Sequence, residues 1–110
     1  MRILPNPFYE HTQDVVAADG TLMIMHGPNY DQTWTITQIS IEMPTAPVGA
    51  TCVVRRMGVF ITNADNPRLA TAAGEPPLFL NGGEHFTVEW EGCTPGDIGK
   101  VTCSYIKAMY

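Results

Sequence analysis

The sequence predicts an all-β protein built as a single small β-sandwich, Ig-like or jelly-roll-like, of about seven or eight strands. Two observations lead to this prediction. Short alternating or β-branched runs recur between clusters of Gly, Pro, Asn and Asp, and no segment sustains an apolar pattern at i, i+3, i+4 and i+7. A length of 110 residues suits one domain with one core, so a single fold must carry the function.

The expected strands follow from these runs, and the expected turns from the clusters between them. We place strands at 13–18, 21–25, 33–43, 50–56, 58–62, 77–80, 84–91 and 99–107. We place turns at 19–20, 26–32, 44–49, 63–68, 81–83 and 93–99. The sandwich domain then spans residues 13–110.

Residues 1–12 are expected to form an extended N-terminal arm. Pro5 and Pro7 hold the chain extended and remove ladder hydrogen bonds. Two placements are open: the arm folds across its own domain or frays, or it reaches onto a neighbouring subunit. In the second placement its apolar residues are the partner-binding anchors, namely Ile3, Leu4, Phe8 and Tyr9.

The run 33–43 contains a change of parity. Trp34 and Ile36 share one face of a flat strand, whereas Ile39 and Ile41 share the other. One extra residue near Thr37–Gln38 would turn both sets to the core, so the pattern predicts a β-bulge there.

The segment 84–93 gathers residues that bind metals or move protons. Its strict alternation around Phe86, Val88 and Trp90 predicts a strand, in which His85 and Glu89 lie about 13 Å apart, too far to share one ion. Glu89 and Glu91 share one face and lie only roughly 6 to 7 Å apart, a separation found in glycosidases, but no pocket is indicated that would desolvate one of them. We therefore expect a scaffold strand with an acidic outer face.

The remaining chemical candidates also favour structural roles. The three cysteines, Cys52, Cys93 and Cys103, are odd in number and lack zinc-ligand spacing. We expect three reduced, buried thiols; the alternative is a disulfide between Cys93 and Cys103 across a final hairpin. Because the three histidines are far apart in sequence and the glycine clusters lack phosphate-binding patterns, we predict no catalytic residue, no metal and no cofactor, and hence no enzyme.

Charge and hydropathy restrict the partners. The net charge is −5, and the six basic residues are scattered, so nucleic acid is not an expected partner. No apolar run reaches the roughly 20 residues needed to span a bilayer, and the short run before Pro5 does not predict a signal peptide. We expect no membrane partner and synthesis in a reducing cytoplasm.

Three segments carry a resemblance to a known group: "DQTWTITQISIEM", "ATAAGEPPLFLNGGEHFTVEW" and "EGCTPGDIGKVTCSYI". They resemble small β-sandwich virion proteins of tailed bacteriophages, especially those of actinobacteria. In that group a Gly/Asp-x-T-W strand leads into a V/I-alternating strand, and an "L-x-G-x-x-x-T-V-x-W" strand precedes a "G-x-x-P-G" turn. The proline-containing arm and the three cysteines depart from the pattern.

The resemblance implies a virion component, on the capsid surface or in the tail. The leading expectation is a decoration or accessory protein that binds the major capsid protein and copies of itself as a symmetric oligomer and stabilises the shell. The alternatives are a minor tail protein or a carbohydrate or cell-surface binding module. For a glycan-binding module the candidate ligand-binding residues are Tyr30 and Phe60.

Overall fold

The computed structural model describes residues 2–63, 68–72 and 78–109, and these residues form strands and no helix. Accordingly, no helix in the described ranges could cross a membrane. The strands are β1 (Arg2–Val15), β2 (Leu22–His26), β3 (Gln32–Glu42), β4 (Thr51–Arg56), β5 (Val59–Asn63), β6 (Leu69–Ala72), β7 (Leu78–Leu80), β8 (Phe86–Glu91) and β9 (Ile98–Met109).

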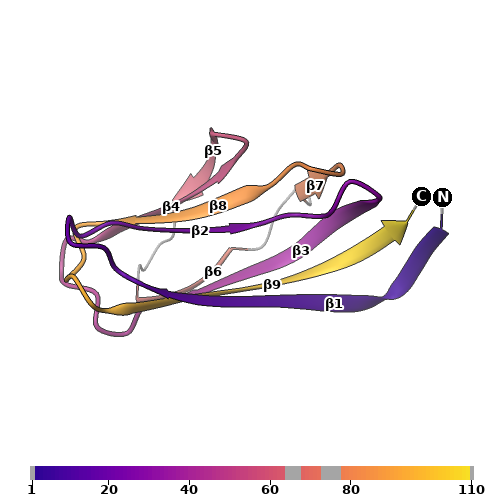
Figure 1. The fold of residues 1–110 in the computed structure, drawn as a ribbon. Helices are drawn as coiled ribbons and strands as arrows, with labels where there is room; N and C mark the ends of the chain where they lie inside the picture. The colour runs from indigo at the N-terminus through magenta and orange to yellow at the C-terminus, as the bar shows by residue number, and fades with distance from the viewer. Residues whose placement is uncertain (1, 64–67, 73–77, 110) are drawn as a thin grey trace.

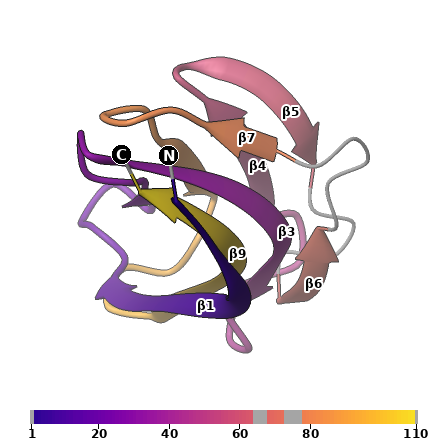
Figure 2. The same ribbon diagram turned by 90° about the vertical axis from the view of Figure 1, so that its right-hand side faces the viewer.

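The strands form two antiparallel sheets that pack face to face, which confirms the predicted all-β sandwich (Figure 1). The first sheet has the order β1-β9-β3-β6, with β7 also paired to β3, and the second has the order β2-β8-β4-β5. The long strands β1, β3 and β9 extend to the end of the molecule where both termini lie: β9 ends there, and β1 and β3 begin there (Figure 1). The first sheet curls around the core (Figure 2). Strands β1 and β2 are the edge strands on one side of the sandwich and contact each other.

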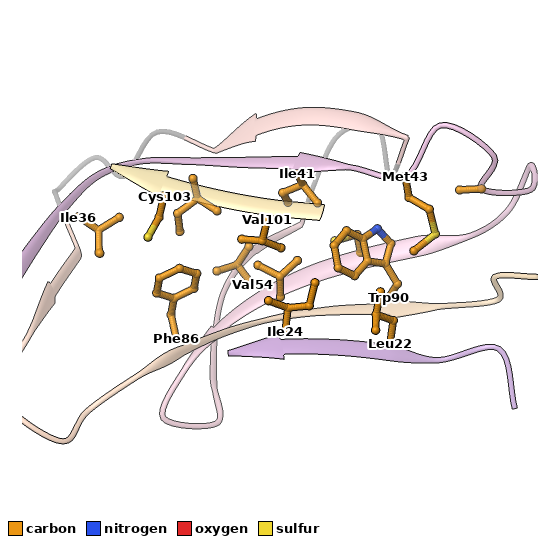
Figure 3. Packing of buried hydrophobic residues seen from close by; sticks show 14 of the residues in the cluster. Leu22, Ile24, Ile36, Ile41, Met43, Val54, Phe86, Trp90, Val101 and Cys103 are labelled. Atoms are coloured by element: carbon orange, nitrogen blue, oxygen red, sulfur yellow. The ribbon is translucent and has the colours of Figure 1, made fainter. Parts of the chain in front are cut away.

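The core lies between the inner faces of the two sheets (Figure 3). Strand β8 supplies Phe86, Val88 and Trp90, all 0 % exposed, as its alternation predicts. Facing residues of β9 and β3 include Val101 and Ile41, also fully buried. Burying large aromatic and branched side chains supplies most of the free energy that holds the sheets together.

The predicted bulge is present in β3. Its register against β9 shifts between Ile36 and Gln38, so Trp34 and Ile36 lie in the core together with Ile39 and Ile41. The extra residue, Thr37, lies at the surface, where its hydroxyl is hydrogen-bonded to the Ser104 hydroxyl at 2.6 Å. The bulge therefore has a structural role: it keeps both apolar sets on one face of the strand.

The predicted arm lies across its own domain, one of the two placements left open, but the expected loss of its ladder hydrogen bonds is wrong. Residues 2–15 form one strand, β1, which pairs with β9 from Arg2↔Met109 to Val15↔Ile98 without a boundary at residue 12. Pro5 and Pro7 act only locally, because the register shifts between Leu4 and Phe8 and then resumes. An edge strand tolerates proline, since one side of its backbone has no partner strand. The arm thus folds across its own domain.

Two other expectations are corrected. Residues 93–99 do not close a hairpin, because β8 belongs to one sheet and β9 to the other, so the turn crosses between sheets. His26 ends β2 instead of lying in a turn. Strand β6 was not predicted, because its sequence LATA is short and half of it is alanine, which has low β-propensity. Strands were predicted at 50–56 and 58–62, and the structure joins them as the hairpin of β4 and β5; its turn is Met57–Gly58, both with positive φ, at 49° and 81°.

Candidate functional site

The outer face of β8 is part of an ion-paired surface. Glu89 accepts a hydrogen bond from the Thr87 hydroxyl at 2.9 Å and pairs with Arg55 of β4 at 3.2 Å. Phe60 of β5 is the direct register partner of Arg55. The face predicted to be acidic is therefore partly neutralised, and its carboxylate at Glu89 is held by two neighbours.

Arg56, the residue after Arg55 on β4, also forms an ion pair with a carboxylate. Arg56 reaches Glu84 at 2.8 Å, and the Asn81 backbone N–H donates to the same carboxylate at 2.7 Å. The hydrogen bond from Asn81 and the charge of Arg56 lower the pKa of Glu84 below its ordinary value. The Glu84 carboxylate stays ionised and links the turn before β8 to the end of β4.

The histidines do not converge. His11 lies on the outer face of β1 and is hydrogen-bonded to Thr102 at 2.8 Å, whereas His26 is buried between the sheets and His85 precedes β8. Within the described residues no group of three His, Cys, Asp or Glu side chains could hold a metal ion. The three histidines therefore do not form a common site, and only His26 lies between the sheets.

The cysteines Cys52, Cys93 and Cys103 are unpaired and buried. Cys103 lies on β9, whereas Cys93 lies in the crossing turn, so the hairpin that would have placed them opposite each other is missing. Burial raises the pKa of both the Cys52 and Cys103 thiols to about 12, so these two residues remain protonated.

Strand β1 divides the four predicted anchor residues between two faces. Leu4 and Phe8 pair with Lys107 and Tyr105 on the inner face, where they are half-buried. Ile3 and Tyr9 point outward and are 64 % and 69 % exposed. If β1 contacts a partner with its side chains, the outward pair is the part available to do so.

On the inner face, three aromatic rings form a stack across β1, β9 and β3. The Phe8 and Tyr105 rings lie 5.8 Å apart, and the Tyr105 and Trp34 rings lie 3.8 Å apart with planes only 15° from parallel. The Lys107 ammonium lies over Phe8, 4.3 Å from its ring centre. The stack fixes the orientation of the Trp34 indole, whose Nε1–H donates to Gln32.

Beside this stack, between the edge strands of the two sheets, lies a partly open pocket of about 170 Å³. Its lining comes from β1, β2, the residue after β2, and β3: Glu10, Thr12, Met25, His26, Gly27 and Trp34. Gly27 allows the loop to approach closely, because a side chain there would collide with the Glu84 carbonyl.

His26 forms the polar wall of the pocket and ties the sheets together. Its Nε2 is hydrogen-bonded to the Thr12 hydroxyl of β1 at 2.7 Å, and its Nδ1 to the Cys103 sulfur of β9 at 3.3 Å. The Phe86 ring packs edge-on against the imidazole at 5.6 Å. Burial lowers the pKa of His26 below its ordinary value, so the imidazole is neutral at pH 7.

Glu10 gives the pocket its negative charge. It lies opposite Cys103 in the β1–β9 ladder and therefore shares the inner face with Phe8 and Thr12. Its charge acts on His26, Cys103 and Tyr105, and together with burial, the larger cause, it raises the pKa of Tyr105 to about 12. A carboxylate at an inward strand position is the signal in the sequence that could have indicated the pocket, once β1 was known to be a strand.

The two candidate glycan-binding residues lie on different elements. Tyr30 is 88 % exposed in the loop between β2 and β3, where its ring lies close to Gly83. Phe60 is half-exposed on the outer face of the second sheet, beside Arg55. No contact in the described residues joins them into one aromatic platform.

Comparison with solved structures supports the fold class. No protein-family model and no curated protein matches the chain. The acid-stable capsid structure of Helicobacter pylori bacteriophage KHP30 contains a chain similar over 94 % of both chains, with a TM-score of 0.59 and 10 % identity. The crystal structure of FlhE is similar over 90 % of this chain and 96 % of that one, with a TM-score of 0.55 and 11 % identity. At these identities the similarity extends to the fold alone, a compact β-sandwich.

Proposed function

We propose that this chain is a non-enzymatic virion structural protein that decorates the outside of a bacteriophage capsid and stabilises its lattice. The observation that carries the proposal is the fold similarity to a chain of a phage capsid structure over nearly the whole length of both chains. That chain is of similar size and has no additional domain, so the two can be compared as whole domains. FlhE shares the fold to a similar degree, so the surface of this chain must supply the rest of the argument.

The outer surfaces suit docking on a protein lattice. Met23 and Met25 of β2 are about half-exposed next to the Arg55–Glu89 pair, and Phe60 lies on the far side of Arg55. Met, aromatic residues and Arg are the types enriched in the centres of protein interfaces. The partners in this proposal are the major capsid protein and further copies of the chain itself, with the outward residues of β1 as additional anchors.

The direct test is to locate the chain in purified particles of the phage that encodes it and count its copies by cryo-electron microscopy. A decoration protein occurs in hundreds of copies on the shell, in keeping with the symmetry of a lattice. A handful of copies at a vertex or in the tail would instead support a minor tail protein. Absence from particles would overturn the virion role.

The role of the β1 anchors is tested separately by adding purified variants to undecorated capsids. We expect Tyr9→Ser to reduce occupancy at limiting concentration, since the exposed ring would lose its contact, whereas the matched control Gln13→Ser on the same face should bind as wild type. Both residues point outward on β1, so neither change removes core packing. Equal occupancy for both variants would remove Tyr9 from the interface.

A carbohydrate or cell-surface binding function is the second candidate, and the exposure of Tyr30 favours it. On a glycan array, wild type would bind a defined set of glycans and Tyr30→Ala would lose them. The capsid proposal expects no specific binding from either protein.

A further inference from the structure

We infer that the pocket between β1 and β2 is a binding site for a guanidinium group, the head of an arginine side chain presented by a protein partner. This inference goes beyond the virion role, because it concerns the chemistry of the pocket and holds for whichever protein supplies the arginine.

The size of the pocket sets the class of ligand. Sites for cofactors and drug-sized molecules occupy about 300 to 1,000 Å³. A pocket of about 170 Å³ is too small for these and is much larger than a single water. It matches one long amino-acid side chain, and its open side lets such a side chain enter from a bound protein segment.

The charge of the pocket selects a cation. The Glu10 carboxylate lines it from the inner face of β1, and in the described residues the ion pairs lie elsewhere, at Arg55–Glu89 and Arg56–Glu84. Nearby Lys107 is placed over the Phe8 ring, where it interacts with the aromatic stack. The facing His26 is neutral, so it adds no positive charge to oppose a bound cation. Glu10 thus faces the pocket without a described counter-ion.

The walls favour arginine over lysine. The exposed lining is mostly polar, and it suits a guanidinium with five N–H donors better than an ammonium with three. Trp34 is held by the Tyr105 ring and by its own bond to Gln32, so this wall is rigid before binding. A guanidinium is planar, stacks on aromatic groups and pairs with a carboxylate through two parallel hydrogen bonds, whereas an ammonium is compact and strongly hydrated.

The inference is tested with isolated protein and the probe Nα-acetyl-arginine methylamide, followed by two-dimensional amide NMR. We expect saturable shifts at the amides of residues 10–12 and 25–27 and at the Trp34 indole N–H. The neutral isostere, Nα-acetyl-citrulline methylamide, should bind about tenfold more weakly or not at all, because it cannot form the charge-assisted pair. The lysine analogue should fall between the two.

Two matched variants separate binding from folding. Glu10→Gln should lower the affinity for the arginine probe about tenfold, while the amide spectrum stays that of a folded protein. Glu91→Gln, an exposed carboxylate at the end of β8, should bind as wild type. Equal affinity for the arginine and citrulline probes, shifts on the outer sheet faces, or unchanged binding by Glu10→Gln would each overturn the inference.

An inward charge on an edge strand can also serve to block unwanted strand pairing. If that is the only role of Glu10, Glu10→Gln will self-associate in size-exclusion chromatography and its affinity for the probe will not change. This outcome contradicts the inference and leaves the virion proposal untouched, since that proposal depends on copy number in particles.

Discussion

His26 is a buried imidazole that joins one sheet to the other, and its burial has a cost that depends on pH. Its hydrogen bonds to Thr12 and Cys103 bridge β2 to β1 and β9. Desolvation lowers its pKa in the folded protein; the charge of Glu10 opposes this shift, and that of His11 adds to it. In the unfolded chain the pKa returns to about 6.5.

We expect this difference to make the protein less stable in mild acid. Below about pH 6.5 the unfolded chain takes up a proton that folded His26 resists, so the free energy of unfolding falls as the pH drops toward the folded pKa. One such group contributes a slope of at most about 1.4 kcal/mol per pH unit. Urea unfolding at pH 8.0, 6.5 and 5.0 measures how the free energy of unfolding changes with pH.

Matched variants identify the residue responsible. His26→Gln keeps a side chain that can hydrogen-bond but does not titrate, so its stability should change less between pH 8.0 and 5.0 than that of wild type. His11→Gln, on the outer face of β1, removes only the smallest cause of the shift in the His26 pKa, so it should keep most of the wild-type slope. If His11→Gln flattens the profile and His26→Gln does not, the assignment to His26 is wrong.

At the scale of elements, the β4–β5 hairpin contains a residue in an unfavourable backbone conformation. Met57 has φ of 49° and is followed by Gly58 at 81°, the two positive values required by a type I′ turn. A left-handed conformation costs a residue with a Cβ roughly 1 kcal/mol, and Asn tolerates it better than most. The side chain of Met57 is about half-exposed, so it contributes little to the core.

Met57→Asn should therefore stabilise the fold by about 0.5 to 1 kcal/mol, because Asn-Gly is the preferred sequence for this turn. The measurement is the shift in urea midpoint at constant m-value. Met57→Ala is the control: it also removes the long side chain but keeps the strained conformation, and it should give no gain. Equal stabilisation by both changes would show that the exposed methionine, and not the backbone, is unfavourable.

Strand β1 shows how an element can be misjudged from its local sequence. Two prolines in the first seven residues indicate an arm without ladder hydrogen bonds, yet the structure confines their effect to a register shift between Leu4 and Phe8. The long partner β9 offers pairing on both sides of this interruption. Strand β8 was predictable because the alternation of apolar and polar residues is a local pattern, and the β3 bulge followed from the same parity argument.

At the scale of the whole molecule, β1 completes the first sheet and covers part of its inner face. Deleting residues 1–12 would expose the edge of β9 and remove the half-buried Leu4 and Phe8 from the Tyr105 side of the aromatic stack. We expect the truncated protein to lose about 2 kcal/mol or more of stability and to aggregate. Thermal unfolding and light scattering after size exclusion measure both effects.

The stability and solubility of the truncated protein distinguish an integral strand from a detachable arm. A detachable arm would leave a monodisperse, equally stable domain after deletion, and that outcome would contradict the pairing of β1 with β9. It also means that a loss of capsid binding after the deletion would not identify a partner contact. Substitutions at the outward positions of β1 are the informative ones.

The sequence by itself determined the fold class, most strand positions, a bulge near Thr37–Gln38 and the strand with one buried apolar face within segment 84–93, because each depends on a periodicity of side chains along a few consecutive residues. Only the tertiary structure decided the place of β1, the crossing of residues 93–99 between sheets, and the pocket of Glu10, His26 and Trp34. These depend on which strands become neighbours. The pocket residues lie on three strands, and their chemistry arises from pairings between distant parts of the chain that no local pattern specifies.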